Sequence, residues 1–480
     1  MNYKLIIYIL GWMLRLEAGL LLLPFLVGLI YHENSAWGYL ITAALCLVIG
    51  YFMARKKPAH RNVYMREGFT VVGLTWLVLS LLGALPFVIS GEIPNYFDAL
   101  FETVSGFTTT GSSILTDVEA LTHASLFWRS FTHWIGGMGV VVFVLSIVPL
   151  LGGSTMNLMR AESPGPVVEK MVPTIRGTAG ALYRIYFGIT IIEIIVLIVM
   201  GMPAFDSLCT TFGTVGTGGF GIKNDSMAGY SAAIQITVTI FMIACGVNFS
   251  FYFYLIRKKL KAALRMEEVM VYFAIIIAAV VLITVNISGS CESTGEAARQ
   301  AFFQVGSIIT TTGYSTTDFQ LWPQMSQTIL VILMLIGACA GSTGGGIKVS
   351  RILILFKSIR KELEVLIHPR LVRKIKVNGS TVSHESIRST NVFIAVYFMI
   401  FFLSVLLISI DEFDFTTNFT AVAATLNNIG PGLNAVGPTA NFAAFSPFSK
   451  IVLIFDMLAG RLEIFPILLL FSPRSWKKYN

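Results

Sequence analysis

Four short segments of the chain each end in a turn that follows a stretch too short to cross a membrane. They read Thr108-Thr-Thr-Gly111-Ser-Ser, Gly216-Thr-Gly-Gly219-Phe-Gly, Thr310-Thr-Thr-Gly313-Tyr-Ser and Asn427-Asn-Ile-Gly430-Pro-Gly. Irregular backbone at membrane depth is tolerated only where it is buried in protein or lines a wet cavity. Glycine freely adopts the backbone angles that turn carbonyl groups inward, so four such turns predict a ring of carbonyl oxygens around a dehydrated cation.

The rest of the chain has the composition of a membrane protein. Of its 480 residues, 55% are hydrophobic and only 12% are charged, whereas soluble domains carry about a quarter charged residues. Apolar runs of about 20 residues, the length of a membrane-spanning helix, recur along the chain. The sequence therefore predicts an all-α polytopic membrane protein, and its hydropathy excludes a soluble nucleic-acid-binding protein.

Charged residues separate by sign along the chain. Basic residues cluster at 55–66, 257–265, 351–376 and 474–478, and we expect these links to face the cytoplasm because Lys and Arg are enriched on that side. The opposite links, which contain all four glycine turns, are acidic, so we expect an acidic vestibule that concentrates cations at the pore mouth. Its expected residues are Glu33, Glu92, Asp98, Glu102, Asp117, Glu119, Glu292, Glu296, Asp318, Asp411, Glu412 and Asp414.

The pattern predicts an N-terminal helical hairpin, near 4–30 and 37–54, followed by four units. Each unit contains a helix, a short re-entrant segment with its glycine turn, and a second helix. The expected ranges are 68–90, 96–110 and 125–151; 179–202, 204–216 and 229–256; 268–289, 295–310 and 324–358; and 390–410, 415–428 and 447–472. The corresponding domains are 1–60 for the hairpin and 61–160, 161–260, 261–375 and 376–480 for the units.

Internal repetition supports this division. The residues eleven positions before the turn glycines are similar, namely Leu100, Leu208, Phe302 and Phe419. Re-entrant segments also keep the basic links on one side, whereas short segments that crossed the membrane would invert half of them. Parallel repeats around an axis along the membrane normal are a known way to build a transport path. We therefore expect four helix–pore-loop–helix repeats in a pseudo-fourfold arrangement around one ion pore.

The third and fourth units carry the most specific motifs. They read Gly337-Ala-Cys-Ala-Gly341-Ser-Thr-Gly-Gly-Gly-Ile-Lys348, Leu426-Asn-Asn-Ile-Gly430-Pro-Gly432 and Ala459-Gly460-Arg461-Leu-Glu463. Together with the turns, they resemble the Trk/Ktr/HKT superfamily of bacterial potassium transporters over nearly the whole chain, and in particular its TrkH/TrkG branch, which has the N-terminal hairpin. The resemblance implies potassium uptake across the bacterial cytoplasmic (inner) membrane by a homodimer in contact with membrane lipid. It also implies a separate cytosolic nucleotide-binding regulatory subunit of the TrkA type, with K⁺ as the transported ion and no organic cofactor on this chain.

The filter residues follow from the turns themselves. They are Thr109, Thr110 and Gly111 in the first unit; Thr217, Gly218 and Gly219 in the second; Thr311, Thr312 and Gly313 in the third; and Asn428, Ile429 and Gly430 in the fourth. We expect the threonines to pack behind the backbone and hold it by hydrogen bonds. Each turn offers essentially one glycine where a stringent potassium filter has a longer TVGYG-like strip, so we expect weaker exclusion of sodium.

A glycine-rich run in the third unit should break its second helix and let a loop enter the membrane. By resemblance this run is an intramembrane gate below the filter, formed by Gly341, Ser342, Thr343, Gly344, Gly345, Gly346 and Lys348, with Arg461 pointing into the pore as a barrier to cations. Two plainer readings stay open: close helix packing through small residues, and a salt bridge from Arg461 to Asp456 or Glu463. A phosphate-binding loop is excluded because Lys348 follows Ile347 and G-x-x-x-x-G-K-[ST] is absent.

Other features are less specific. His133 favours close helix packing, Asn248 either lines the pore or bonds a neighbouring helix, and the link 362–390 either docks a cytosolic partner or is a solvated loop. The five cysteines have no metal-ligand spacing and imply no disulfide framework. The chain is not expected to be an enzyme, because no paired carboxylates, His/Cys cluster or nucleophile elbow lies in a plausible site. The alternative within transport is a potassium symporter coupled to protons or sodium.

Overall fold

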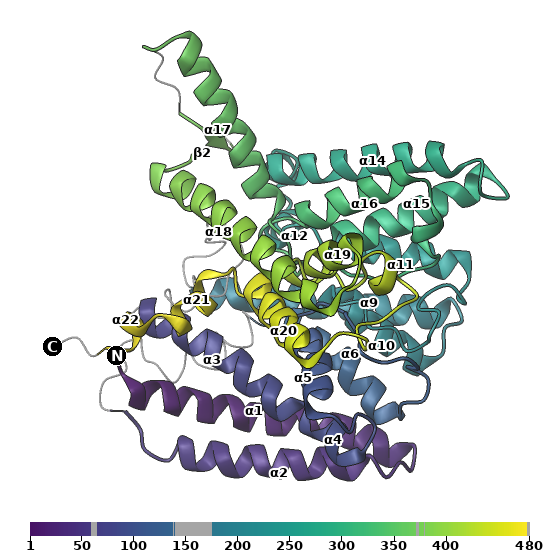
Figure 1. The fold of residues 1–480 in the computed structure, drawn as a ribbon, viewed down its shortest axis with the longest axis vertical. Coiled ribbons are helices and arrows are strands. Elements are labelled where there is room, and N and C mark those ends of the chain that lie inside the picture. Colours follow the sequence, from purple (N-terminus) through teal and green to yellow (C-terminus); the bar gives the residue numbers. More distant parts are fainter. Residues whose placement is uncertain (59–64, 138, 140–174, 371–373, 379, 478–480) are drawn as a thin grey trace.

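The computed structural model describes residues 1–58, 65–137, 139, 175–370, 374–378 and 380–477 (Figure 1). Over these residues the regular secondary structure is helical, apart from one short antiparallel hairpin of β1 (Lys376–Val377) and β2 (Ser380–Thr381). Six helices are long and apolar enough to span a membrane, and a seventh span results if one bent helix pair is counted as a single crossing. The predicted class, an all-α polytopic membrane protein, is confirmed.

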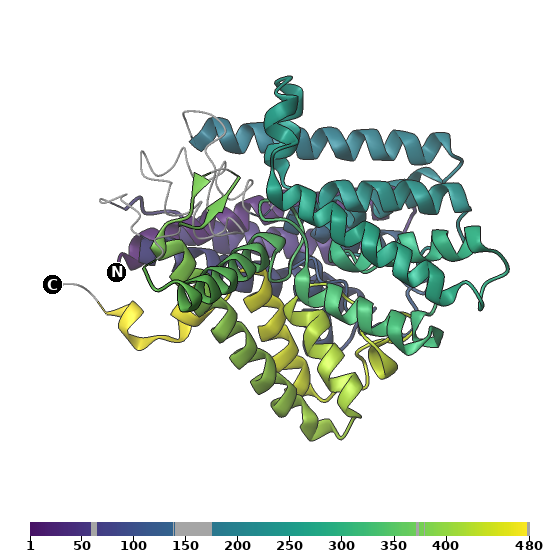
Figure 2. The same cartoon turned by 90° about the horizontal axis from the view of Figure 1, so that it is seen from above.

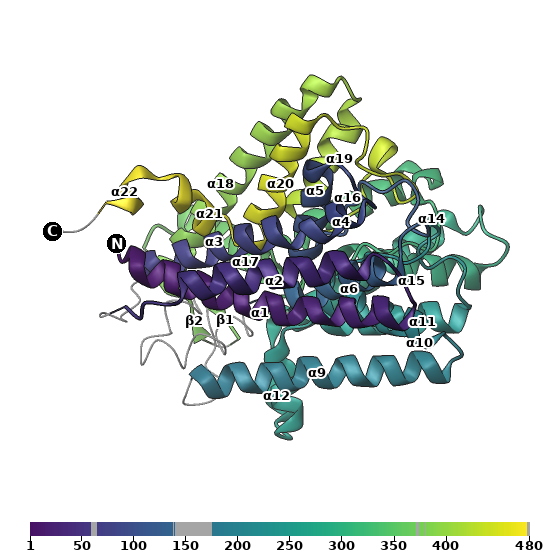
Figure 3. The same cartoon turned by 90° about the horizontal axis from the view of Figure 1, so that it is seen from below.

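The chain begins with the predicted hairpin of α1 (Tyr3–Ile30) and α2 (Ala36–Met53), which lie side by side in Figures 1 and 3. Small residues bring the two helices together, since a Cβ atom on Gly50 would lie 2.6 Å from the carbonyl oxygen of Gly11. Close approach through glycine is a common way for helices to pack in membranes.

Four units follow, and each repeats the order of a long helix, a short helix and a second long segment. The first unit contains α3 (Met65–Gly83), α4 (Leu85–Ser90), α5 (Tyr96–Phe107) and α6 (His123–Gly137); the second contains α9 (Ile175–Val199), α10 (Ala204–Gly216), α11 (Ala232–Cys245) and α12 (Phe249–Ile256). The third contains α14 (Glu267–Ile287), α15 (Thr294–Ile309), α16 (Gln324–Ile336) and α17 (Val349–Ile367); the fourth contains α18 (His384–Ile408), α19 (Phe415–Leu426), α20 (Pro447–Arg461) and α21 (Phe465–Phe471). The remaining short elements are α13 (Leu260–Ala263), η1 (Phe319–Leu321), η2 (Ser409–Asp411), η3 (Asn434–Val436) and α22 (Pro473–Trp476).

Figures 2 and 3 place α9 and α18, the long first helices of units two and four, at opposite edges of the bundle. Units two and four therefore lie on opposite sides of the bundle, as a fourfold arrangement requires. The two ends of the described chain lie close together: the rings of Tyr3 on α1 and Trp476 on α22 stack with their centroids 6.4 Å apart.

The short helices α5, α10, α15 and α19 end at the four glycine turns. Three of them begin at a side-chain cap, in which Asn95, Ser293 and Asp414 accept hydrogen bonds from Phe97, Glu296 and Thr417 N–H groups. Such caps satisfy main-chain donors that the first helical turn leaves without partners. These caps define where α5, α15 and α19 start, whereas α10 follows Pro203 and has no side-chain cap.

The second long segment of units two to four is broken near its middle. The break at 337–348 in unit three agrees with the predicted glycine-rich loop. In unit two, however, 229–256 is not continuous, because α11 and α12 meet at 93° and Asn248 caps α12. In unit four, 447–472 is interrupted at Leu462–Ile464, where Glu463 and Ile464 have positive φ angles.

Some predictions fall on residues that the structure does not describe. The expected helix 125–151 is present as α6 up to Gly137, whereas residues 138 and 140–151 lie outside the described residues. The same holds for the domain boundaries at 60/61 and 160/161 and for Arg61, Arg373 and Lys478 in the basic clusters. The boundary at 260/261 falls inside α13.

Candidate ion filter and gate

The four glycine turns share one backbone conformation. The residue two positions before each glycine has a positive φ angle: 54° at Thr109, 53° at Thr217, 59° at Thr311 and 56° at Asn428. The next residue donates its N–H to the carbonyl five residues earlier at 2.8 or 2.9 Å, in the pairs Thr110–Ser105, Gly218–Gly213, Thr312–Ser307 and Ile429–Ala424. This is the Schellman ending of a helix. A β-branched residue rarely adopts such a φ angle, so three strained threonines in matched positions indicate a functional turn.

Each turn glycine lies against the main chain of the next turn. A Cβ atom built on Gly111 would lie 2.2 Å from the Gly218 oxygen, and one built on Gly219 would lie 1.9 Å from the Thr312 oxygen. A Cβ atom on Gly313 would lie 1.9 Å from the Ile429 oxygen, and one on Gly430 would lie 2.9 Å from the Thr110 oxygen. The contacts run from unit one to two, two to three, three to four and four back to one. Main-chain carbonyl oxygens from all four turns therefore meet in one closed ring.

The turn threonines hold this ring in two ways. Thr110 Oγ1 lies 2.8 Å from Thr108 Oγ1, and Thr312 Oγ1 lies 2.8 Å from Thr310 Oγ1, so paired hydroxyls brace the first and third turns. In the fourth turn Asn428 replaces a threonine, and its Nδ2 donates to Thr110 Oγ1 at 2.9 Å. The amide thus links the fourth turn to the first across the boundary between units.

A hollow of about 190 Å³ opens over the ring and is lined by all four turn glycines. Its charged lining residues are Arg129 and Lys223, and no Asp or Glu is among the described residues that line it. Carboxylates lie directly behind this lining, since Asp117 and Glu119 hydrogen-bond Asn224, so the wider acidic vestibule stays a prediction.

The outer carboxylates instead hold loops and helix ends. Asp98 pairs with Lys450 at 2.6 Å, and Glu33 accepts from the N–H of His123 at the start of α6. The Thr417 hydroxyl, hydrogen-bonded to Asp414, lowers the pKa of that carboxyl, and the Asn224 amide does the same for the pKa of Asp117. Their positions in the sequence predict that these carboxylates lie on the outer side. The sequence does not show that neighbouring groups donate hydrogen bonds to them.

The gate loop, residues 337–348, lies against the third and fourth turns. The N–H of Gly345 donates to Thr311 Oγ1 at 2.6 Å. A Cβ atom on Gly344 would lie 2.8 Å from the Thr310 oxygen, and one on Gly345 would lie 2.4 Å from the Asn427 oxygen. The glycines thus allow the loop to pack directly on the filter turns.

Two neighbouring elements anchor the gate loop. Glu268 on α14 accepts from the N–H groups of Ala340 and Ser350, at 2.5 and 3.1 Å, and so holds both ends of the loop. At the α11–α12 break, the N–H of Phe249 donates to the Gly341 oxygen at 3.0 Å. Asn248 caps α12 through a 2.9 Å bond from Ser250 N–H and lies beside Gly341. Its side chain also hydrogen-bonds Glu268 on α14, which agrees with the predicted bond to a neighbouring helix.

Two cations meet at the gate loop. Lys348 has a φ angle of 83°, and its ammonium group donates to the carbonyl of Gly344 within the loop. Arg461 donates to the carbonyl of Thr343 at 2.7 Å and to that of Gly136 on α6 at 2.5 Å. A cavity of about 40 Å³ is lined by both cations together with Gly344, Gly345 and Gly460.

The two carboxylates considered as salt-bridge partners of Arg461 have partners elsewhere. Asp456 accepts from the Ser404 hydroxyl at 2.7 Å, and Glu463 pairs with Arg351. Glu268 and Arg351, which bond the loop at 337–348, were not singled out as gate residues from the sequence. In the sequence each is only a charged side chain at the edge of an apolar span. For Arg351 the enrichment of basic residues on the cytoplasmic side already accounts for such a charge.

The family model for TrkH, described as a cation transport protein, matches residues 38–478. The chain belongs to the TrkH family. Membership makes it a membrane transporter rather than an enzyme and confirms the resemblance to the TrkH/TrkG branch.

Relatives match the chain over its full length. It is 39% identical over 493 residues to the Trk system potassium uptake protein TrkH of Salmonella typhimurium, with 100% of both chains covered. It is 32% identical to the Trk system potassium uptake protein TrkG of Escherichia coli strain K12, with 99% of both covered. The crystal structure of the potassium transporter TrkH from Vibrio parahaemolyticus matches with a TM-score of 0.89 at 35% identity, covering 99% of this chain and 100% of that one.

Proposed function

We propose that this TrkH-family chain takes up potassium across the bacterial cytoplasmic membrane and that the closed ring of four glycine turns is its ion filter. The observation that supports the filter is the cyclic set of contacts in which each turn glycine meets the carbonyl before the next one. The names of the full-length relatives support potassium as the ion.

In this proposal a potassium ion enters the outer hollow, loses water and is held by main-chain oxygens of the ring. Four short helices end at the turns, and the partly negative ends of their dipoles favour a cation there. Inward movement follows the membrane potential, which contributes about 2.3 kcal/mol per charge per 100 mV. With essentially one glycine per turn, the filter discriminates against sodium less strictly than a longer carbonyl strip.

Below the ring, the gate loop closes the path. Its glycines pack against the third and fourth turns, and Arg461 ties Thr343 in the loop to Gly136 on α6. In the closed state this arginine places a positive charge next to the ion path. Opening moves the loop away from the turns and breaks these hydrogen bonds.

The assembly we propose is a homodimer in membrane lipid, regulated by a cytosolic nucleotide-binding subunit of the TrkA type. The chain itself carries K⁺ as its transported ion, and we expect no organic cofactor on it. Its proposed division is an N-terminal hairpin over 1–60 and pore repeats over 61–160, 161–260, 261–375 and 376–480, the third containing the gate loop.

The filter is tested by two glycine substitutions with different surroundings. A Cβ atom on Gly219 would overlap the Thr312 oxygen, whereas Gly201, which also has a positive φ angle, has nothing within 4 Å of its Cβ position. Both alanines carry backbone strain of about 1–3 kcal/mol, so only the steric contact with the ring differs. We expect Gly219→Ala to abolish selective rescue of a potassium-uptake-deficient bacterium and Gly201→Ala to retain it. Equal rescue by both variants, present at equal level in the membrane, would refute the filter.

A further inference from the structure

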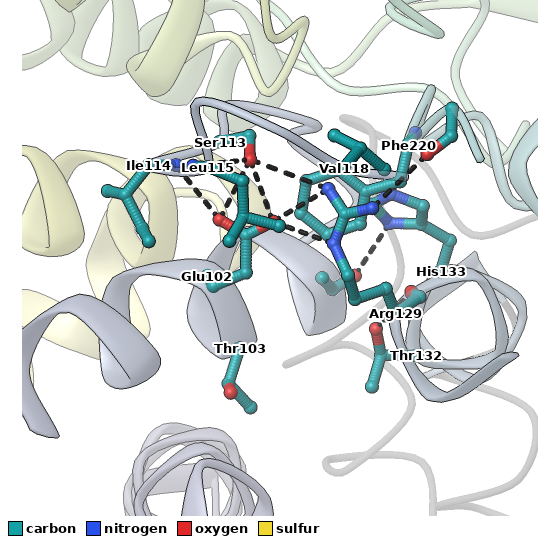
Figure 4. A network of polar contacts seen from close by, with 12 residues as sticks. Glu102, Thr103, Ser113, Ile114, Leu115, Val118, Arg129, Thr132, His133 and Phe220 are labelled. Carbon is teal, nitrogen blue, oxygen red and sulfur yellow. Dashed lines mark hydrogen bonds and ion pairs between the residues drawn. The ribbon is translucent and has the colours of Figure 1, made fainter. Parts of the chain in front are cut away.

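A buried ion pair lies beside the first two filter turns (Figure 4). Arg129 on α6 and Glu102 on α5 are 2% and 1% exposed. The Glu102 Oε1 atom lies 2.7 Å from Arg129 Nη2 and 2.8 Å from Nε. Glu102 also accepts from the Ser113 hydroxyl at 2.9 Å and from the N–H of Ile114 at 3.0 Å. The pair therefore fixes the segment that leaves the first turn.

Arg129 also reaches the second unit. Its Nη1 donates to the carbonyl of Gly221 at 3.2 Å, and its guanidinium carbon lies 4.1 Å from the centre of the Phe220 ring. Phe220 and Gly221 directly follow the filter glycine Gly219. One guanidinium thus contacts the segments that leave both turns, through an ion pair on one side and a carbonyl and an aromatic face on the other.

His133 makes a second contact of the same kind, one helical turn further along α6. Its Nδ1 lies 2.8 Å from the carbonyl oxygen of Gly106 on α5, and the N–H of Phe220 donates to Nε2 at 3.2 Å. A carbonyl can only accept and an N–H can only donate, so the ring is neutral with its hydrogen on Nδ1. The imidazole therefore bridges the first pore helix and the second filter segment.

The other joints of the ring are held differently. Tyr314, after the third turn, donates its hydroxyl to the Thr210 carbonyl of unit two at 3.1 Å. Asn428 of unit four donates to Thr110 of unit one. Further bonds between neutral groups support these two joints, from Ser315 N–H to Ser226 at 3.2 Å and from the Ser112 hydroxyl to the Gly430 carbonyl at 3.1 Å. The joint between units one and two differs, because it has a desolvated ion pair and an imidazole.

We propose that Arg129 and His133 are positioning residues that set the distance between the first and second filter turns and thereby the preference for potassium over sodium. The inference rests on the proposed filter. Ion discrimination by carbonyls depends on the size and stiffness of the cage. A planar guanidinium with several fixed donors holds two segments at a defined separation, which a flexible ammonium group does not.

The test must separate positioning from folding, because removing one partner of a buried ion pair leaves an uncompensated charge. Arg129→Lys keeps the charge and loses the fork. Its matched control is Lys450→Met, which breaks the 2.6 Å pair with Asp98, one helical turn before Glu102 on the same helix α5. That pair joins α5 to α20 and makes no contact with the second filter turn.

The measurement is potassium and sodium uptake by proteoliposomes that contain the full chain, expressed as a ratio. We expect Arg129→Lys and His133→Gln to lower the potassium-to-sodium ratio about tenfold while potassium uptake persists, and Lys450→Met to keep the wild-type ratio. A purely structural role would lower both ion fluxes in proportion and leave the ratio unchanged, which would overturn the proposal. If Arg129→Lys does not reach the membrane, His133→Gln carries the same test.

Failure of the filter itself is distinguishable. If the wild type shows no preference for potassium, or if Gly219→Ala keeps that preference, the filter assignment is wrong. If both of those results support the filter and the positioning variants still retain the wild-type ratio, only the positioning role of Arg129 and His133 is wrong.

Discussion

The Thr311 hydroxyl accepts a hydrogen bond from the N–H of Gly345 at 2.6 Å and so joins the third filter turn to the gate loop. Thr311 is fully buried, and its φ angle of 59° places it among the strained turn residues. The loop cannot leave without breaking this bond, so in the proposed mechanism we expect the state of the gate and the shape of the filter to be coupled.

Replacing Thr311 by Val should weaken the closed gate. The N–H of Gly345 would lose its acceptor in a buried site, at a cost of about 1–3 kcal/mol, which corresponds to roughly a 5–150-fold shift in the closed–open equilibrium. The measurement is potassium flux into proteoliposomes without a regulatory subunit, which should rise. Thr217→Val is the control, because the Thr217 hydroxyl donates only within its own turn, to Gly216. Equal fluxes from the two variants would contradict the link.

The four turn glycines should differ in their tolerance of alanine. The Cβ position at Gly430 lies 2.9 Å from the nearest oxygen of the next turn, whereas those at Gly219 and Gly313 lie 1.9 Å away. Small shifts can relieve the first contact but not the other two. We expect Gly430→Ala to retain part of the potassium uptake while Gly313→Ala loses it, as measured by growth at low potassium. An equally severe loss at both positions would show that backbone strain, not the ring contact, decides the outcome.

The sequence was sufficient to locate the turns and the gate loop because both depend on local chemistry. Glycine at a matched offset after a short helix specifies each turn, and the run from Gly341 to Gly346 interrupts a helix wherever it is placed. The break at 246–248 was not predicted, because a single glycine and a capping asparagine also occur within ordinary helix ends. It becomes visible only where Phe249 and Gly341 meet.

The contacts of residues that act across element and unit boundaries could not be predicted from the sequence. Arg129 and Glu102 lie 27 residues apart and become partners only because α5 and α6 pack together. Glu102 was expected to attract cations at the pore mouth, yet it is buried against Arg129. Charge sign along the chain predicts the side of the membrane, but pairing decides whether a carboxylate faces water.

Glu268 offers a test of how the gate loop is anchored. Its Oε1 atom accepts from Ala340 and Ser350, which flank the glycine-rich part of the loop. Glu268→Ala leaves both N–H groups without this acceptor and should raise flux in the absence of a regulatory subunit. Glu268→Gln keeps a side-chain oxygen and should stay close to the wild type. If both variants behave alike, the hydrogen bonds to the loop are not what holds it.

Arg461 should act as a latch on the gate loop as well as a positive charge. It donates to Thr343 in the loop and to Gly136 on α6, and a hydrogen bond to a charged group contributes about 1.5–3 kcal/mol. Arg461→Ala should therefore raise basal potassium flux at least about tenfold. Arg461→Lys separates the two roles, because it keeps the charge but cannot reproduce the two-armed geometry.

The control for Arg461 is Arg15 on α1, a second arginine within an apolar helix, whose guanidinium lies over the Trp12 ring and reaches the Tyr51 carbonyl. Arg15→Ala should leave basal flux unchanged, since its contacts stay within the N-terminal hairpin. High flux in Arg461→Ala and low flux in Arg461→Lys would assign the barrier to charge, while high flux in both would assign it to the latch. Loss of Arg461→Ala from the membrane with no change in flux per molecule would instead favour a residue that only holds helices together.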